Sequence, residues 1–234
     1  MNKKQKAMTP PHKTLHIGLI MAASGGFIDA YTYITRGGVF AFAQTGNIIF
    51  MGINLTEGNF LTCLMYAVPI AAYFVGVFIT DYLNTKITRN RVVTIEVITI
   101  ATEILLLILV GCMPPWVPNI IVTLVVSFLS AIQVQSFRAI YNTPYACTMC
   151  TGNLRSSAER LRKYFSTKEK EHFTHFLRYT AINTAFFTGA AAGTLFSNLI
   201  HEKAALVVCL MLSSSLFMIV TTRRKKINLS HFEK

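Results

Sequence analysis

The sequence predicts an all-α integral membrane protein with six transmembrane helices, arranged as two inverted three-helix repeats. The membrane class follows from composition: 53% of the 234 residues are hydrophobic and only 14% are charged. Average soluble chains carry about 25% charged residues, so this chain lacks the charge to coat a globular surface. The mean hydropathy of +0.48 also excludes a disordered chain. The repeat is predicted by one tripeptide that occurs twice.

Six apolar stretches each come close to the length of about 20 residues that a membrane-crossing helix needs. They lie at residues 15–34, 60–83, 92–112, 117–138, 174–199 and 204–222. The first stretch could instead belong to a cleaved signal peptide, whose apolar core usually has about 7–15 residues. This stretch is longer, contains Asp29 and lacks small residues spaced for cleavage, so we expect an uncleaved first span.

The basic residues predict how the spans are oriented. The formal net charge is +12, from 22 Lys and Arg against 10 Asp and Glu, and the positive charges lie in short runs between apolar stretches. Such runs mark cytoplasmic connections and are not a nucleic-acid surface. They alternate with connections poor in basic residues, which six spans with both termini in the cytoplasm require. We therefore expect a single membrane domain over residues 1–234, with cytoplasmic basic tails at 1–14 and 223–234.

One tripeptide divides the chain into two halves. Thr45-Gly46-Asn47 follows the first stretch, and Thr151-Gly152-Asn153 follows the fourth, 106 residues further along. The halves are residues 15–112 and 117–222, and each holds three spans. Because three is odd, the halves must have opposite orientations in the membrane, an arrangement that recurs in secondary transporters with the substrate near the midplane. The alternative is coincidence between apolar helices of similar composition.

Each Thr-Gly-Asn motif has the composition of a helix start, where Thr or Asn caps backbone N–H groups and glycine allows close approach. About ten apolar residues follow the first motif, enough for a re-entrant half-helix, because ten residues rise about 15 Å. The second motif opens an amphipathic basic helix, expected at the cytoplasmic interface. Alternatively, both motifs only cap connecting helices. The candidate substrate-binding residues are Thr45, Gly46, Asn47, Thr151, Gly152 and Asn153.

Polar residues inside the apolar stretches are the candidates for coupling, because an ionisable group in the membrane is costly. They are Asp29, Glu103, Gln135 and Asn183, and the repeat places Gln135 at the position equivalent to Asp29. Asp29 is the candidate for proton or cation coupling. Its alternative role is hydrogen bonding to irregular backbone near a motif.

Small residues predict close helix packing at Gly76, Gly189 and Gly193, either between the two halves or between two protomers of a homo-oligomer. Cys147 and Cys150 form a C-x-x-C pair, but a structural metal site would need two more ligands and no second pair lies nearby. No phosphate-binding glycine loop or hydrolase motif is present. We therefore expect no metal, no cofactor and no enzymatic activity.

The sequence resembles the YoaK family of bacterial multi-pass membrane proteins. The resemblance rests on residues 26–30 (GFIDA), on 37–40 (GGVF) and on both Thr-Gly-Asn motifs, and it covers about residues 16–222. In the family pattern methionine often precedes the first motif, whereas this chain has Gln44, which places a polar group there. The resemblance implies a bacterial inner-membrane location and a six-span fold, but no substrate.

The leading functional hypothesis is a secondary transporter or channel for a small solute, bound centrally between the repeats. Helix N-termini attract negative charge, which favours an anionic or carboxylate-bearing solute. The second hypothesis is a non-transporting scaffold or assembly factor that acts through the basic helix near residues 155–165. An intramembrane enzyme is the third. The lipid bilayer is the one partner common to all three.

Overall fold

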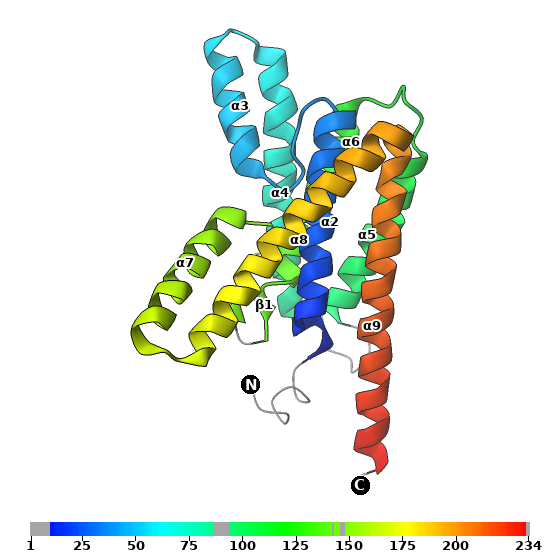
Figure 1. Ribbon diagram of the computed structural model, residues 1–234. Coiled ribbons are helices and arrows are strands. Elements are labelled where there is room, and N and C mark those ends of the chain that lie inside the picture. Colours follow the sequence, from blue (N-terminus) through cyan, green and yellow to red (C-terminus); the bar gives the residue numbers. More distant parts are fainter. Residues whose placement is uncertain (1–9, 87–93, 142, 146–147, 233–234) are drawn as a thin grey trace.

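The computed structural model describes residues 10–86, 94–141, 143–145 and 148–232, which form a bundle of helices (Figure 1). In chain order the elements are η1 (Pro11–Lys13), α2 (Leu15–Thr35), α3 (Gln44–Thr56), α4 (Phe60–Lys86), α5 (Ile95–Cys112), α6 (Asn119–Ser136), β1 (Ala139–Ile140), β2 (Thr143–Pro144), α7 (Cys150–Thr167), α8 (Lys170–Ile200), η2 (His201–Ala204) and α9 (Ala205–Phe232). The two short strands pair antiparallel as a hairpin between α6 and α7.

Five segments of the described chain are long and apolar enough to cross a membrane. Four of them are α2, α4, α5 and α6. The fifth, Lys170–Arg224, is 55 residues long and contains α8, η2 and most of α9. The all-α membrane class is therefore confirmed.

Several predicted helix ends differ from the structure: α4 continues to Lys86 and α8 begins at Lys170, and two further differences have a clear physical reason. The fourth stretch, expected to reach residue 138, ends at Ser136, because Phe137 leaves the helical conformation and the chain enters the β1–β2 hairpin. The last stretch, expected to end at residue 222, continues to Phe232. Lys and Arg are good helix formers, so the basic run at 223–226 does not end the helix.

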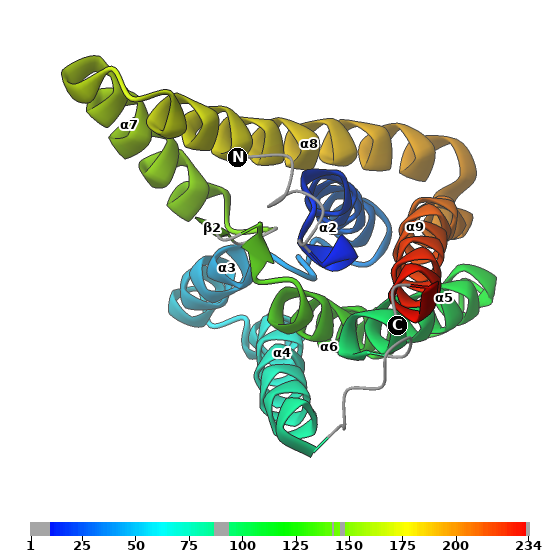
Figure 2. The ribbon, with the colours of Figure 1, turned by 90° about the horizontal axis from the view of Figure 1, so that it is seen from below.

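Helix α2 lies inside the bundle, with α8, α9 and α6 around it (Figure 2). It packs most extensively on α8, and in the same way α6 packs on α4. Helix α5 packs on α9, and an Arg223–Glu96 ion pair of 3.6 Å joins them near the end where α2 begins and α9 ends. We call this the lower end, as it is drawn in Figure 1.

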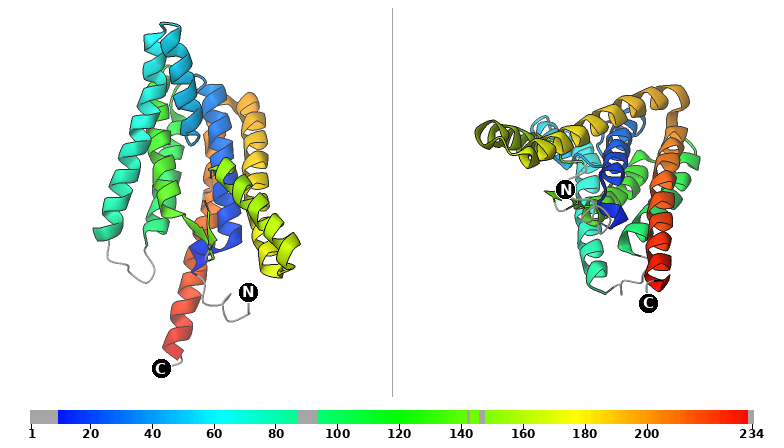
Figure 3. Two further views of the ribbon diagram at one scale, coloured as in Figure 1. Left: turned by 90° about the vertical axis from the view of Figure 1, so that its left-hand side faces the viewer. Right: turned by 60° about the horizontal axis from the view of Figure 1, so that its bottom comes forward.

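Helices α3 and α7 each begin near mid-height and run in opposite directions, α3 toward the upper end and α7 toward the lower end (Figures 1 and 3). Each packs on the next helix, α3 on α4 and α7 on α8, to form a helical hairpin. At 1.5 Å per residue, the 13 residues of α3 span about 20 Å, which is less than the thickness of a bilayer core.

Small residues allow the close crossings in this bundle. Gly26 of α2 lies against the carbonyl of Phe186, and Gly189 and Gly193 of α8 lie against the backbone of α2. A Cβ atom on Gly76 of α4 would lie 2.9 Å from the carbonyl oxygen of Phe128 in α6. The three glycines singled out in the sequence therefore lie at the α2–α8 and α4–α6 crossings, within one chain.

Candidate functional site

The first Thr-Gly-Asn motif lies at the junction between α2 and α3. The helix begins at Gln44, one residue before the motif, and its N-cap residue Ala43 makes no side-chain capping bond. Asn47 is fully buried and reaches back to the preceding loop. Its Oδ1 accepts from the backbone N–H of Phe40 at 3.0 Å, and its Nδ2 donates to the Phe40 carbonyl at 2.7 Å.

The expectation that Thr or Asn caps the helix is therefore wrong for the first motif. The helix starts too early for Thr45 to be the cap, and Asn47 fixes the loop before the helix. The same offset occurs in the second motif, where α7 begins at Cys150 with Met149 as an N-cap that makes no side-chain bond. Both motifs place their threonine inside the first helical turn.

Asp29 holds the same loop from the other side. Its Oδ1 accepts hydrogen bonds from the backbone N–H groups of Phe42 at 2.7 Å and Ala43 at 3.4 Å. The hydroxyl of Ser130 in α6 donates to the carbonyl of Ala41 at 2.7 Å. The irregular backbone before α3 is therefore held by side chains from α2, α3 and α6, and Asp29 has the backbone-bonding role.

The second motif lies at the start of α7, against α8. Nδ2 of Asn183 in α8 donates to the carbonyl of Cys150 at 3.4 Å, and two turns further along α7 the hydroxyls of Ser157 and Thr180 are 2.9 Å apart. Asn153 is 3% exposed, whereas Thr151 and Gly152 are exposed. These contacts fix the first turn of α7 beside the middle of α8.

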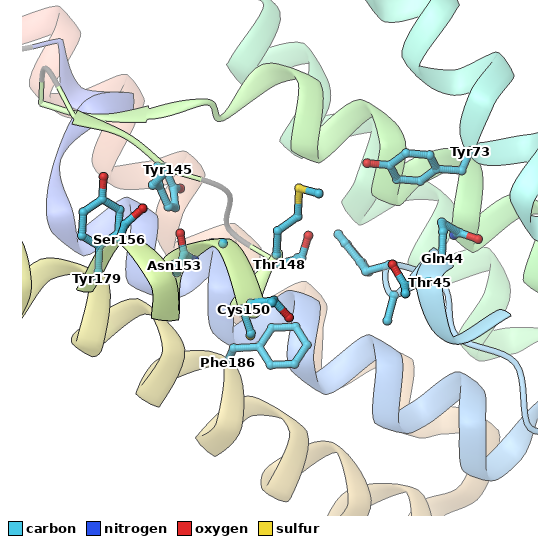
Figure 4. A pocket seen from close by; sticks show the side chains of 15 residues that line it. Gln44, Thr45, Tyr73, Tyr145, Thr148, Cys150, Asn153, Ser156, Tyr179 and Phe186 are labelled. Atoms are coloured by element: carbon cyan, nitrogen blue, oxygen red, sulfur yellow. The ribbon is translucent and has the colours of Figure 1, made fainter. Parts of the chain in front are cut away.

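The starts of α3 and α7 face one another across a cavity of about 610 Å³ (Figure 4). Gln44 and Thr45 line it from α3, and Met149 with the first turn of α7, Cys150 to Asn153, lines it from the other side. The other lining residues come from α4, α8, the second turn of α7 and the two loops: Phe42, Ala43, Tyr73, Tyr145, Thr148, Ser156, Tyr179 and Phe186. The structure thus brings Thr45 of the first motif and all three residues of the second, 106 residues further along, to one cavity, whereas Gly46 and Asn47 do not line it.

The cavity wall is mainly apolar, and the polar groups in it are uncharged. It offers hydroxyl, amide and phenol groups beside two phenylalanine rings, and its lining contains no Lys, Arg, His, Asp or Glu among the described residues. The backbone N–H groups at the start of α7 give this part of the wall a partial positive charge. Such a wall can bind a small solute through hydrogen bonds and ring contacts.

The other predicted polar residues do not reach this cavity. Gln135 lies near the lower end, where its Nε2 donates to Oδ1 of Asp81 at 2.7 Å and its Oε1 accepts from Arg138. The repeat pairs Gln135 with Asp29 in sequence, but the two make different contacts. Glu103 is 2% exposed within α5, and its Oε2 has no hydrogen-bond partner among the described residues.

Sequence reasoning missed most of the aromatic wall. Tyr73, Tyr145, Tyr179 and Phe186 occur within or beside apolar stretches, where aromatic residues carry no distinguishing signal. In the sequence Gln44 stands out only as a departure from a family pattern, yet its side chain lines the cavity and its Oε1 accepts a hydrogen bond from Nδ2 of Asn47 at 2.9 Å.

Of the C-x-x-C pair, Cys147 lies outside the described residues. Within them, no three His, Cys, Asp or Glu side chains group in a way that could hold a metal ion.

Long apolar helices packed side by side, with an uncharged cavity among them, define a multi-pass membrane protein. The chain belongs to the family described as "Protein of unknown function (DUF1275)", whose model matches residues 17–219. It is similar to the UPF0700 transmembrane protein YoaK of Bacillus subtilis (strain 168), with 23% identity over 158 residues, covering 66% of this chain and 70% of that protein. The resemblance to the YoaK family is confirmed. No solved structure matches the chain significantly.

Proposed function

We propose that this protein is a secondary transporter or channel for a small solute, without enzymatic activity, and that the cavity between α3 and α7 is its central site. The observation that carries the proposal is the meeting of two helix starts, one from each half of the chain, at one cavity. Discontinuous helices whose N-termini point at a substrate near mid-membrane are a recurring feature of secondary transporters.

The packing of the helices supports an inverted repeat. The first helix of each half packs on the long helix of the other half, as α2 does on α8 and α6 does on α4. Each half also contributes a short helix that folds back on its own long helix, α3 on α4 and α7 on α8. Exchange of the two halves therefore reproduces the pattern of contacts, as expected for two copies of one unit with opposite orientation.

Six spans complete this arrangement. The 55-residue segment Lys170–Arg224 would be about 80 Å long as one helix, far more than the hydrocarbon core of about 30 Å. η2 interrupts it, so we assign α8 and α9 to separate crossings. By the positive-inside rule we assign the lower end and both termini to the cytoplasm of a bacterial inner membrane, since Lys13, Lys86 and Arg223 lie in elements that begin or end there.

The cavity wall supports a solute with one anionic group and a hydrogen-bonding body. The start of α7 offers backbone N–H groups of the first turn and the positive end of a helix dipole, which together suit a carboxylate. The start of α3 is less available, because the nearby backbone already donates to Asp29. Hydroxyl and aromatic side chains would hold the remainder of the molecule.

The test is binding and flux with a pair of shape-conserving variants. Purified protein is screened by thermal shift against small carboxylates and other anions, and a stabilising compound is then tested for uptake into proteoliposomes. Thr45→Val with Thr151→Val removes two cavity hydroxyls, and we expect binding about tenfold weaker or more, since each lost hydrogen bond contributes about 1 kcal/mol. Thr188→Val, on the exposed side of α8, is the matched control.

Uptake that is equal in the double variant and the control would remove the cavity from the mechanism.

An alternative function has one observation in its favour, namely the exposed basic surface of α7, which suits a scaffold that binds another protein. A stoichiometric protein retained through purification, together with no uptake of any compound, would favour that alternative.

Homo-oligomer formation stays a prediction. Helix α4 exposes Phe74 and Phe78 by 72% and 68%, which suits either lipid or a second protomer.

A further inference from the structure

Helix α7 presents three different faces, and only one of them is covered by protein. The covered face packs on α8, where Ser157 pairs with Thr180, Arg160 lies 3.3 Å from His172, and the Tyr164 and Phe173 rings are 5.0 Å apart.

The second face of α7 is an apolar stripe. Leu154, Ala158, Leu161 and Phe165 recur every three or four residues and therefore share one side of the helix. Leu154 is 60% exposed and Phe165 is 61% exposed. Two large apolar side chains left uncovered on a helix that is otherwise polar indicate a surface that meets something apolar.

The third face of α7 is basic. Arg155, Arg162 and Lys163 are exposed and follow the apolar stripe around the helix. Arg155 pairs with Glu159 at 2.9 Å, and this pair holds the pKa of the Glu159 carboxyl below its usual value. Arg162 and Lys163 add two further positive charges, so the face is net positive.

Contacts with α8 set the level of α7 relative to the membrane. The last charged residue in the first half of α8 is Arg178, and residues 179–200 are free of charge. Ser157 of α7 lies beside Thr180, within the uncharged part, whereas Arg160 lies beside His172, in the charged part. Helix α7 therefore crosses the level at which the hydrocarbon ends and the headgroups begin.

We propose that α7 is a binding site for anionic phospholipid, with acyl chains on the Leu154–Phe165 stripe and headgroup phosphates on Arg155, Arg162 and Lys163. An amphipathic helix at the boundary, with apolar and basic faces side by side, fits a lipid that is apolar at one end and negative at the other. An acidic protein partner would complement the basic face but would leave the apolar stripe exposed. This site is separate from the cavity between α3 and α7.

A tryptophan reporter tests the proposal in the full chain. The sequence has one tryptophan, Trp116, in the connection between α5 and α6. Trp116→Phe combined with Phe165→Trp moves the reporter to α7, and the protein is reconstituted into phosphatidylcholine bilayers containing a fixed fraction of brominated phosphatidylglycerol or brominated phosphatidylcholine. We expect the brominated anionic lipid to be enriched about fivefold around α7, as judged from quenching, and the enrichment to fall with added salt.

Neutralisation of the basic face tests whether the preference for anionic lipid comes from the charges of α7 or from its apolar stripe. Arg155→Gln, Arg162→Gln and Lys163→Gln in the reporter background should make quenching by the two lipids equal, while quenching itself persists because the apolar stripe remains. The wild-type protein, whose Trp116 lies at the upper end, is the control and should show no preference for the anionic lipid. Equal quenching by both lipids before neutralisation would overturn the anionic site. Absence of quenching by either lipid would overturn lipid contact and favour a protein partner.

Discussion

Helices α3 and α7 begin with the same tripeptide at the same cavity, yet they are chemically opposite. Helix α3 contains no charged residue between Gln44 and Thr56, and it exposes Ile48, Ile49, Ile53 and Leu55 by 46–56%. Helix α7 carries four basic residues and one acidic residue between Cys150 and Thr167. Each packs on the long helix that follows it.

Both motifs lie in the first turn of a helix, and the difference shows that the residues that follow decide which environment the helix can occupy. A charged residue at the centre of a bilayer costs about 2.5–3.5 kcal/mol on insertion scales, so the charges of α7 require access to headgroups or water. The apolar surface of α3 suits hydrocarbon. An inverted repeat can therefore keep its contact pattern while its two short helices occupy different solvents.

The two motifs also differ in how tightly they are packed. A Cβ atom on Gly46 would meet the Phe40 ring at 2.7 and 2.9 Å, whereas nothing lies within 4 Å of a Cβ atom on Gly152. The first motif is thus a close-packed junction and the second an open one, which agrees with the larger share of the cavity wall that α7 provides.

A charge placed on each short helix gives the largest expected difference. Ile49→Lys in α3 should lower the free energy of unfolding by about 3 kcal/mol in a bilayer, because the lysine faces hydrocarbon. Phe165→Lys in α7 should lower it by less than about 1 kcal/mol, because a lysine near the headgroups extends to them. Unfolding in lipid nanodiscs measures both. Equal losses would show that the two helices share one environment.

Removal of the buried amide of the first motif gives the next largest effect. Asn47→Ala leaves the backbone N–H and carbonyl of Phe40 without their partner, so we expect a loss of about 2–3 kcal/mol. Thr45→Val, on the exposed side of the same turn, should change the free energy of unfolding by less than about 0.5 kcal/mol. Similar melting temperatures for the two variants would contradict a structural role for Asn47.

A methyl group added at each motif glycine tests the difference in packing between the two motifs. Gly46→Ala should destabilise the protein by about 1–2 kcal/mol, since the Phe40 ring must move. Gly152→Ala should leave stability within about 0.5 kcal/mol of wild type. Because Gly152 lines the cavity, its methyl group should instead weaken the binding of any solute found by thermal shift. Equal destabilisation by the two substitutions would show that both motifs are packed alike.

Substitutions at the α3–α4 and α7–α8 contacts should have the smallest effect on the free energy of unfolding. Helix α3 meets α4 through rings, with Phe50 and Tyr66 at 5.5 Å, whereas α7 meets α8 through the Ser157–Thr180 hydroxyl pair. Ser157→Ala should cost no more than about 1 kcal/mol, because one hydrogen bond is lost and Thr180 stays accessible to other partners. The rate at which a protease cleaves the α7–α8 hairpin, compared with wild type, measures whether the contact between the two helices opens. A decrease in the free energy of unfolding as large as that of Asn47→Ala would indicate a larger role for the Ser157–Thr180 pair.

The membrane class, the family and the approximate positions of the helices could be predicted from the amino-acid sequence alone. Apolar length and the distribution of charge are local properties, so the first stretch expected at 15–34 matches α2 at Leu15–Thr35, and the stretch expected at 174–199 lies within α8. The two tripeptides also marked both short helices to within one residue of their starts.

The roles of the polar residues became clear only from the folded arrangement of the chain. Asp29 and Gln135 are equivalent in the repeat, but one bonds loop backbone and the other bonds Asp81 and Arg138. Threonine faces the cavity in both motifs, while Asn47 turns away to fix a loop. The physical reason is that a buried polar group is satisfied by whichever partner folding brings near it, and that partner lies on another segment of the chain.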